Sequence, residues 1–109
     1  MSIISKLTTI RDALSTLEYS VFHYSKGTSN TRKYIVWMET GEGESLHLNN
    51  QKDEQTIEGT IDLFTTIEYD HIIDDIQRVL NEKDISFVLS DVQYEEENDI
   101  IHYTWEWEL

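Results

Sequence analysis

The sequence predicts an α+β domain, in which two helices pack on one face of a mainly antiparallel sheet of four to five strands. Two segments carry apolar residues at helical spacing, and several others are rich in β-branched and aromatic residues that alternate with polar ones. The 109 residues suit one domain spanning 1–109, and 39% hydrophobic with 28% charged residues is typical of a globular chain.

The first element is an amphipathic helix over residues 3–17, with Ser2 as its N-cap. Polar residues separate the members of an apolar stripe that a sheet or another helix has to cover. The stripe consists of Ile3, Ile4, Leu7, Ile10, Leu14 and Leu17.

Two strands follow, over 19–24 and 33–39, because both segments are rich in aromatic and β-branched residues. Residues 25–33 between them form a loop, with Gly27 and Asn30 as turn residues. We expect the two strands to form a hairpin with a long, basic tip.

The next stretch is less regular. Residues 40–45 contain two glycines and break the strand pattern, and 46–50 are ambiguous, with a short edge strand as one interpretation. The sequence predicts a long mobile arm over 40–55, since loops of this length are usually functional or disordered.

A third strand is predicted over 56–65, where one face is apolar and the other is wet. The apolar side carries Ile57, Gly59, Ile61 and Leu63, and the other side carries Glu58, Thr60, Asp62 and Phe64.

A second amphipathic helix is expected over about 67–82, with its apolar stripe at Ile72, Ile73, Ile76, Val79 and Leu80. Acidic residues near its start (Glu68, Asp70) and basic residues near its end (Arg78, Lys83) suit the helix dipole.

The chain closes with a strand over 85–90, an acidic turn over 94–99 and a last strand over 100–109. The last strand alternates sharply. One face carries Ile101, Tyr103, Trp105, Trp107 and Leu109, and the other carries Ile100, His102, Thr104, Glu106 and Glu108.

The net charge of −14 is divided unevenly. Residues 1–52 hold six basic and five acidic residues, whereas 53–109 hold two basic and seventeen acidic ones. Such a chain repels nucleic acid and acidic membranes, except locally around Lys26, Arg32 and Lys33. Solubility alone is one explanation of the charge, but it does not account for the asymmetry between the halves. The opening residues mix polar and apolar side chains without an unbroken apolar core, so we expect no secretory signal, and the short apolar runs predict no membrane span.

No segment carries a catalytic, cofactor-binding or metal-binding signature. The chain has no cysteine, and GEGES at 41–45 lacks the lysine of a phosphate-binding loop. The four histidines (His23, His47, His71, His102) and the acidic pairs (Asp74 with Asp75, Glu106 with Glu108) are expected to be structural or solvated. We therefore expect no catalytic residues, no metal and no cofactor, and a protein that is not an enzyme.

The three tryptophans (Trp37, Trp105, Trp107) all fall on predicted strands. Core packing against the helices is the favoured interpretation. A subunit interface is the alternative, because tryptophan is enriched there and the helices cover only one sheet face.

The segments KYIVWMET, TIEGTIDLFT, EYDHIIDDIQRVL and YEEENDIIHYTWEWEL resemble the tail terminator, or tail completion, proteins of long-tailed bacteriophages and prophages. The resemblance covers most of the chain and is better after Lys33. It implies a virion structural protein that forms a ring, commonly a hexamer, which caps the tail tube and presents a surface to the head connector. It places the chain in the virion tail, or in the host cytoplasm during assembly, with DNA passing through the ring without sticking.

Charge and periodicity suggest which residues would serve such a ring. Carboxylates on the wet strand faces would line a lumen that repels phosphate: Glu58, Asp62, Glu106 and Glu108. A head-to-tail ring also needs two complementary patches on each subunit. Candidates for subunit or tail-tube contacts are Lys26, Arg32, Lys33, Glu42, Glu44, Trp105 and Trp107.

Two other functions stay open. One is an acidic protein-binding module, such as a DNA mimic that blocks a basic site on a partner. The other is a small enzyme, which would need a concave site with perturbed titratable groups.

Overall fold

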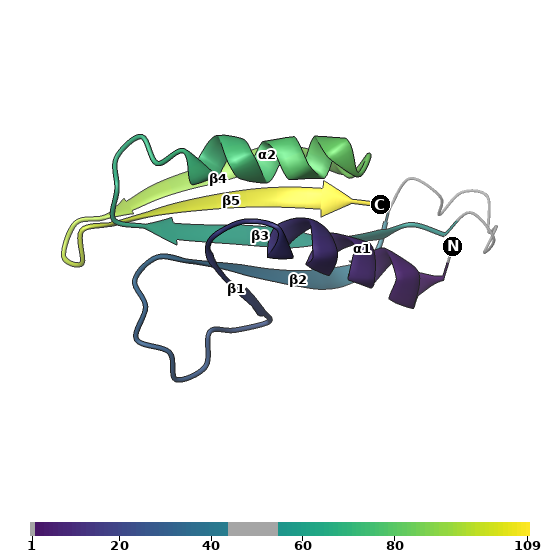
Figure 1. The fold of residues 1–109 in the computed structure, drawn as a ribbon, viewed down its shortest axis with the longest axis horizontal. Helices are drawn as coiled ribbons and strands as arrows, with labels where there is room; N and C mark the ends of the chain where they lie inside the picture. Colours follow the sequence, from purple (N-terminus) through teal and green to yellow (C-terminus); the bar gives the residue numbers. More distant parts are fainter. Residues whose placement is uncertain (1, 44–54) are drawn as a thin grey trace.

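The computed structural model describes residues 2–43 and 55–109 and has an α+β fold (Figure 1). The elements are α1 (Ile3–Ser15), β1 (Ser20–His23), β2 (Tyr34–Glu42), β3 (Ile57–Thr65), α2 (Ile72–Glu82), β4 (Ser86–Glu95) and β5 (Ile100–Glu108). The strands form one sheet in the order β1-β2-β3-β5-β4, and three of its four pairings are antiparallel. Both helices lie on the same face of this sheet, so the predicted fold class is confirmed.

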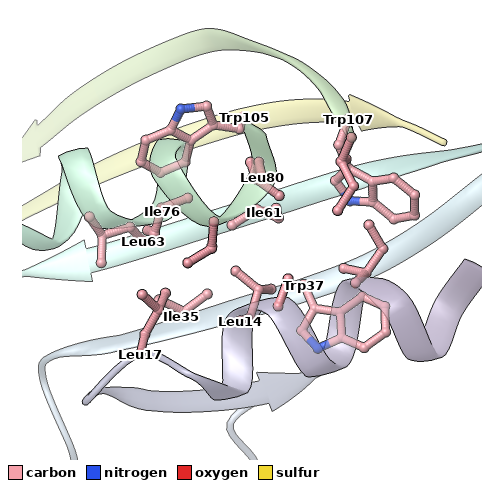
Figure 2. Close-up of a cluster of buried hydrophobic side chains, with 14 of the residues drawn as sticks. Leu14, Leu17, Ile35, Trp37, Ile61, Leu63, Ile76, Leu80, Trp105 and Trp107 are labelled. Atoms are coloured by element: carbon pink, nitrogen blue, oxygen red, sulfur yellow. The ribbon is translucent and has the colours of Figure 1, made fainter. Parts of the chain in front are cut away.

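The core lies between the helices and one face of the sheet (Figure 2). Trp37, Trp105 and Trp107 are 3%, 0% and 2% exposed, so all three pack in the core. The predicted alternation of the third strand is confirmed, because every second residue of β3 is buried. The core-facing side chains of the sheet come from β2, β3 and β5: Ile35, Trp37, Ile57, Ile61, Leu63, Trp105 and Trp107.

The predicted hairpin between the first two strands is wrong. β1 runs parallel to β2, with Ser20 opposite Tyr34 and His23 opposite Trp37. Residues 24–33 return the chain to the end of the sheet where β1 began, which a two-residue hairpin turn cannot do. Alternation and composition identify a strand but not its direction, and a loop this long allows either direction.

The predicted N-cap of the first helix is confirmed, since the Ser2 hydroxyl accepts a hydrogen bond from the Ser5 amide at 3.1 Å. The second helix, however, begins at Ile72 and not at 67. Tyr69 has a positive φ of 60°, which a helix does not allow. The Asp70 carboxylate then accepts from the Ile72 amide at 3.1 Å and starts the first turn.

Asp70, just before α2, also accepts hydrogen bonds from the segment that follows α1 and from the end of β3. Its carboxylate accepts hydrogen bonds from the buried Thr65 hydroxyl at 2.7 Å and from the Tyr19 hydroxyl at 3.3 Å. Burial raises the pKa of Tyr19 to about 12, and the negative charge of Asp70 contributes to the rise. The segment after α1 is therefore tied to the segment before α2 by a satisfied polar cluster.

The strands also differ from their predicted bounds. β4 continues past residue 90 to Glu95, so only the later part of the predicted acidic turn connects it to β5. β2 reaches Glu42 and contains a bulge between Glu39 and Gly41. Within the predicted arm, 40–42 belong to β2, whereas 44–54 lie outside the described residues, as does the ambiguous segment 46–50.

Candidate functional site

The sheet face opposite the helices, which we call the open face, carries the alternate side chains of each strand. The register between neighbouring strands places these side chains together on one surface. Its central members are Phe22, Tyr34, Val36, Met38, Glu58, Thr60, Asp62, Phe64, His102, Thr104, Glu106 and Glu108.

All four carboxylates that the sequence singled out lie on the open face, on the adjacent strands β3 and β5. Glu58 is directly opposite Glu108, and Glu106 lies opposite Thr60. Asp62 lies opposite Thr104, further along the same pair of strands. The Thr56 hydroxyl donates to the Glu108 carboxylate at 2.8 Å.

Three of these carboxylates border an open hollow of about 330 Å³ at one end of the sheet. Glu58, Glu106 and Glu108 line it together with Ser86 and Val88. The Glu106 side chain is exposed, and the other two are half-buried. Within residues 2–43 and 55–109, no group of three or more histidines and carboxylates is arranged to hold a metal ion. The hollow is therefore a water-exposed surface lined by carboxylates.

Asp62 belongs to a hydrogen-bonded cluster in the middle of the open face. One carboxylate oxygen lies 2.8 Å from His102 Nε2 and accepts from the Thr104 hydroxyl at 2.8 Å. The three side chains are half-buried and hold one another in place. The cluster therefore fixes the position of one of the four carboxylates.

A row of aromatic rings crosses the open face at right angles to the strands. Phe22 meets Tyr34 edge-on at 6.3 Å, Tyr34 stacks on Phe64 at 4.5 Å, and Phe64 stacks on His102 at 4.1 Å. Alternation placed Phe64 and His102 on the polar side of their strands, but nothing in the sequence showed that four strands would align these rings. Only the register between the strands brings them together.

This row is not a platform for nucleobases. Such platforms present free ring faces on which bases stack. Here Tyr34, Phe64 and His102 turn their ring faces toward one another, and the Lys26 ammonium lies 4.6 Å from the centre of the Tyr34 ring. Burial raises the pKa of Tyr34, and the negative charges of Glu95 and Asp62 raise it further. The rings of the open face therefore stack on one another, and carboxylates lie close to them.

The three basic contact candidates belong to the loop between β1 and β2. The Lys26 ammonium donates to the Thr31 carbonyl at 3.2 Å, and Lys33 lies 5.9 Å from the Tyr19 ring. The Arg32 guanidinium donates to the backbone carbonyl of Asn98, in the turn between β4 and β5. The basic loop therefore lies beside the acidic turn of its own chain.

The remaining contact candidates divide into three cases. Trp105 and Trp107 are core residues, so their assignment to a subunit contact is corrected: burial leaves neither side chain a surface for a partner. Glu42 ends β2 and accepts a hydrogen bond from the Gln55 side chain at 2.7 Å. Glu44 lies outside the described residues.

The two histidines on strands, His23 and His102, belong to different clusters. His23 in β1 stacks between Tyr24 and Trp37, and its Nε2 lies 2.8 Å from Glu39. Burial raises the pKa of Glu39, but hydrogen bonds from Tyr24 and His23 outweigh it and leave the pKa below its usual value. β2 and β3 lie between β1, which carries His23, and β5, which carries His102.

Of the other two histidines, the structure describes only His71, which belongs to neither cluster. His71 is exposed at the start of α2, and His47 lies outside the described residues.

No protein-family model matches the chain, and no curated protein matches its sequence. Within the described part of the chain, neither helix has the length and apolar character needed to cross a membrane.

Proposed function

We propose that this protein is a structural assembly subunit of the tail-terminator type, forming a ring that caps a phage tail tube and joins it to the head connector. In this role the open face borders the path of the DNA. In this proposal the protein binds neighbouring subunits and repels DNA, and it catalyses no reaction. The observation that carries the proposal is the gathering of Glu58, Asp62, Glu106 and Glu108 on the sheet face opposite α1 and α2, the helices of the described residues (Figure 1).

The charge of the open face supports this role. DNA carries one negative charge about every 1.7 Å along its axis, so a surface of carboxylates repels it at close range. Repulsion is useful where DNA has to move past a protein without binding to it. The aromatic row supports the same role, because Phe64 stacks on Tyr34 and on His102, so these neighbours occupy the ring faces on which a base would stack.

The distribution of charge along the chain supports a ring. A head-to-tail ring joins two different patches of neighbouring subunits. Lys26, Arg32 and Lys33 lie within a single loop, whereas the acidic excess lies in the second half of the chain. Arg32 is exposed, and its contact with Asn98 engages one of the five N–H donors of a guanidinium. The loop therefore retains donors for the acidic surface of a neighbour.

Light scattering over a range of protein concentrations tests the ring. We expect the mass to rise from 12.9 kDa toward a fixed multiple of it, with six copies as the expected number. The double variant Arg32→Glu with Lys33→Glu reverses the basic loop and should abolish this rise. A matched control is Arg11→Glu with Arg78→Glu, which makes the same change of charge on exposed helical positions that are 60% and 55% exposed. Equal assembly by the two double variants would contradict a contact through the basic loop.

The same experiment separates the ring from an acidic binding module. A DNA mimic stays at 12.9 kDa at every concentration and binds a basic enzyme tightly, with an affinity that falls steeply as salt is added. A chain that behaves in this way would contradict the ring and support the mimic.

A further inference from the structure

The outer edge of β4 is long and open. β4 spans Ser86–Glu95 and is the last strand of the sheet (Figure 1). It pairs with β5 on one side, and no other strand of the described residues pairs with its second side. An edge of this kind presents backbone N–H and C=O groups to any extended chain that approaches it.

The side chains of this edge are unusually apolar for their exposure. Val88, Leu89, Val92 and Tyr94 are 57%, 40%, 51% and 59% exposed. Natural proteins usually protect an edge strand with lysine, proline or a covering element. The segment SFVLSDVQYE contains no lysine, arginine or proline, and its one irregularity is a bulge between Leu89 and Asp91. The outer edge of β4 can therefore form backbone hydrogen bonds with another strand, and it also exposes apolar side chains that such a strand could cover.

Negative charge surrounds the same edge. Asp91 and Glu95 belong to β4 itself, and the turn that follows carries three more carboxylates, at Glu96, Glu97 and Asp99. Pairing between the β4 edges of two copies would bring these carboxylates together, and like charges across a strand pair are destabilising. The charge therefore disfavours a second copy on this edge and favours a cationic chain.

We propose that the β4 edge binds an extended, cationic segment of another protein by strand addition. The main chain of the segment would extend the sheet as a sixth strand. The register with β5 places Val92 and Tyr94 on one sheet face and Asp91 and Glu95 on the other. The apolar side chains of the segment would cover Val92 and Tyr94, and its lysines or arginines would meet Asp91 and Glu95. The partner is a protein and not a nucleic acid, because this edge would repel phosphate. The inference goes beyond the ring and holds whether or not the chain forms one.

The experiment uses the full chain and a ten-residue peptide in which lysine alternates with valine and threonine. A peptide with glutamate in place of lysine is the anionic probe. Calorimetry at low and high salt measures the affinity, and hydrogen exchange measures protection of the segment 86–95. We expect the cationic peptide to bind, to slow exchange within 86–95 and to lose affinity as salt is added, and the anionic peptide not to bind.

Two variants locate the binding. Val92→Lys should weaken it about tenfold, because it places a cation on the edge and removes apolar contact. Ile4→Lys makes the same change on α1, at a side chain that is 73% exposed, and should leave the affinity within about twofold. If Val92→Lys lowers stability, Asp91→Asn with Glu95→Gln provides the second test. That variant keeps the apolar side chains and should bind the cationic peptide about tenfold more weakly.

Three results would overturn the proposal. One is absence of protection in 86–95 at saturating cationic peptide. Another is equal affinity of Val92→Lys and Ile4→Lys. The third is protection of 86–95 in the protein alone as its concentration rises, because the occupant of the edge would then be a second copy.

Discussion

Replacing Trp105 by alanine should lower the free energy of unfolding by about 4 kcal/mol, the largest effect expected of any single substitution here. The indole is fully buried between the helices and the sheet, where it packs with Ile61, Ile76 and Leu80 (Figure 2). Its Nε1 donates to the Gln77 side chain of α2 at 3.0 Å. The substitution therefore leaves a large cavity and removes a hydrogen bond between β5 and α2.

Denaturant unfolding followed by far-ultraviolet circular dichroism measures the loss, since this signal comes mainly from the backbone, whereas tryptophan fluorescence would change with the removed indole. Tyr94→Ala is the matched control, because Tyr94 is an aromatic residue of the same hairpin and is 59% exposed. It should cost less than about 1 kcal/mol. A Trp105→Ala loss no larger than that of Tyr94→Ala would contradict the position of the indole in the core.

Replacing Gly59 by alanine should cost about 3 kcal/mol, although only one methyl group is added. A Cβ at this position of β3 would lie 2.0 Å from the backbone oxygen of Met38 and 2.6 Å from a ring carbon of Trp107. The first neighbour is backbone and cannot move without shifting β2. The second is an indole whose Nε1 is held by the Thr60 carbonyl at 3.1 Å.

Gly41→Ala is the control for this prediction. Gly41 lies in β2, next to the bulge, and a Cβ there meets nothing within 4 Å. It should be neutral or slightly stabilising, because alanine restricts the unfolded chain. Thermal unfolding of both variants beside the parent decides the matter, and equal melting temperatures for the two would show that Gly59 is not required by its neighbours.

The sequence predicts the layers of this fold well, because a strand or helix with one buried face carries its apolar residues at a regular spacing. The alternation in 56–65 and 100–109 separates the core-facing residues from Glu58, Asp62, Glu106 and Glu108. Strand register then determines whether such residues become neighbours. The open face could therefore be predicted strand by strand, but not the opposition of Glu58 and Glu108.

The features that the sequence missed depend on contacts between distant segments. The direction of β1 is set by pairing with β2, and the aromatic row depends on the alignment of four strands. The delayed start of α2 follows from the positive φ of Tyr69 and from the hydrogen bond that the Ile72 amide donates to the Asp70 carboxylate. The length of β4 was missed because both of its faces are largely exposed, which weakens the period that a half-buried strand displays.

The central claim is that the open face lines the inside of an assembly, and chemical labelling tests it directly. The chain has no cysteine, so one introduced cysteine reports on one surface. Glu106→Cys lies on the open face and Asp74→Cys on α2, and both positions are exposed. Each variant is assembled, its mass is confirmed by light scattering, and it is treated with a small maleimide or with one carrying a long polyethylene glycol chain.

Both cysteines should react with both reagents in the monomer. In the assembly, the small reagent should still modify both positions, whereas the large one should modify Asp74→Cys and be excluded from Glu106→Cys. If the large reagent modified Glu106→Cys in the assembly as fast as in the monomer, the open face would not be enclosed and the account would be contradicted.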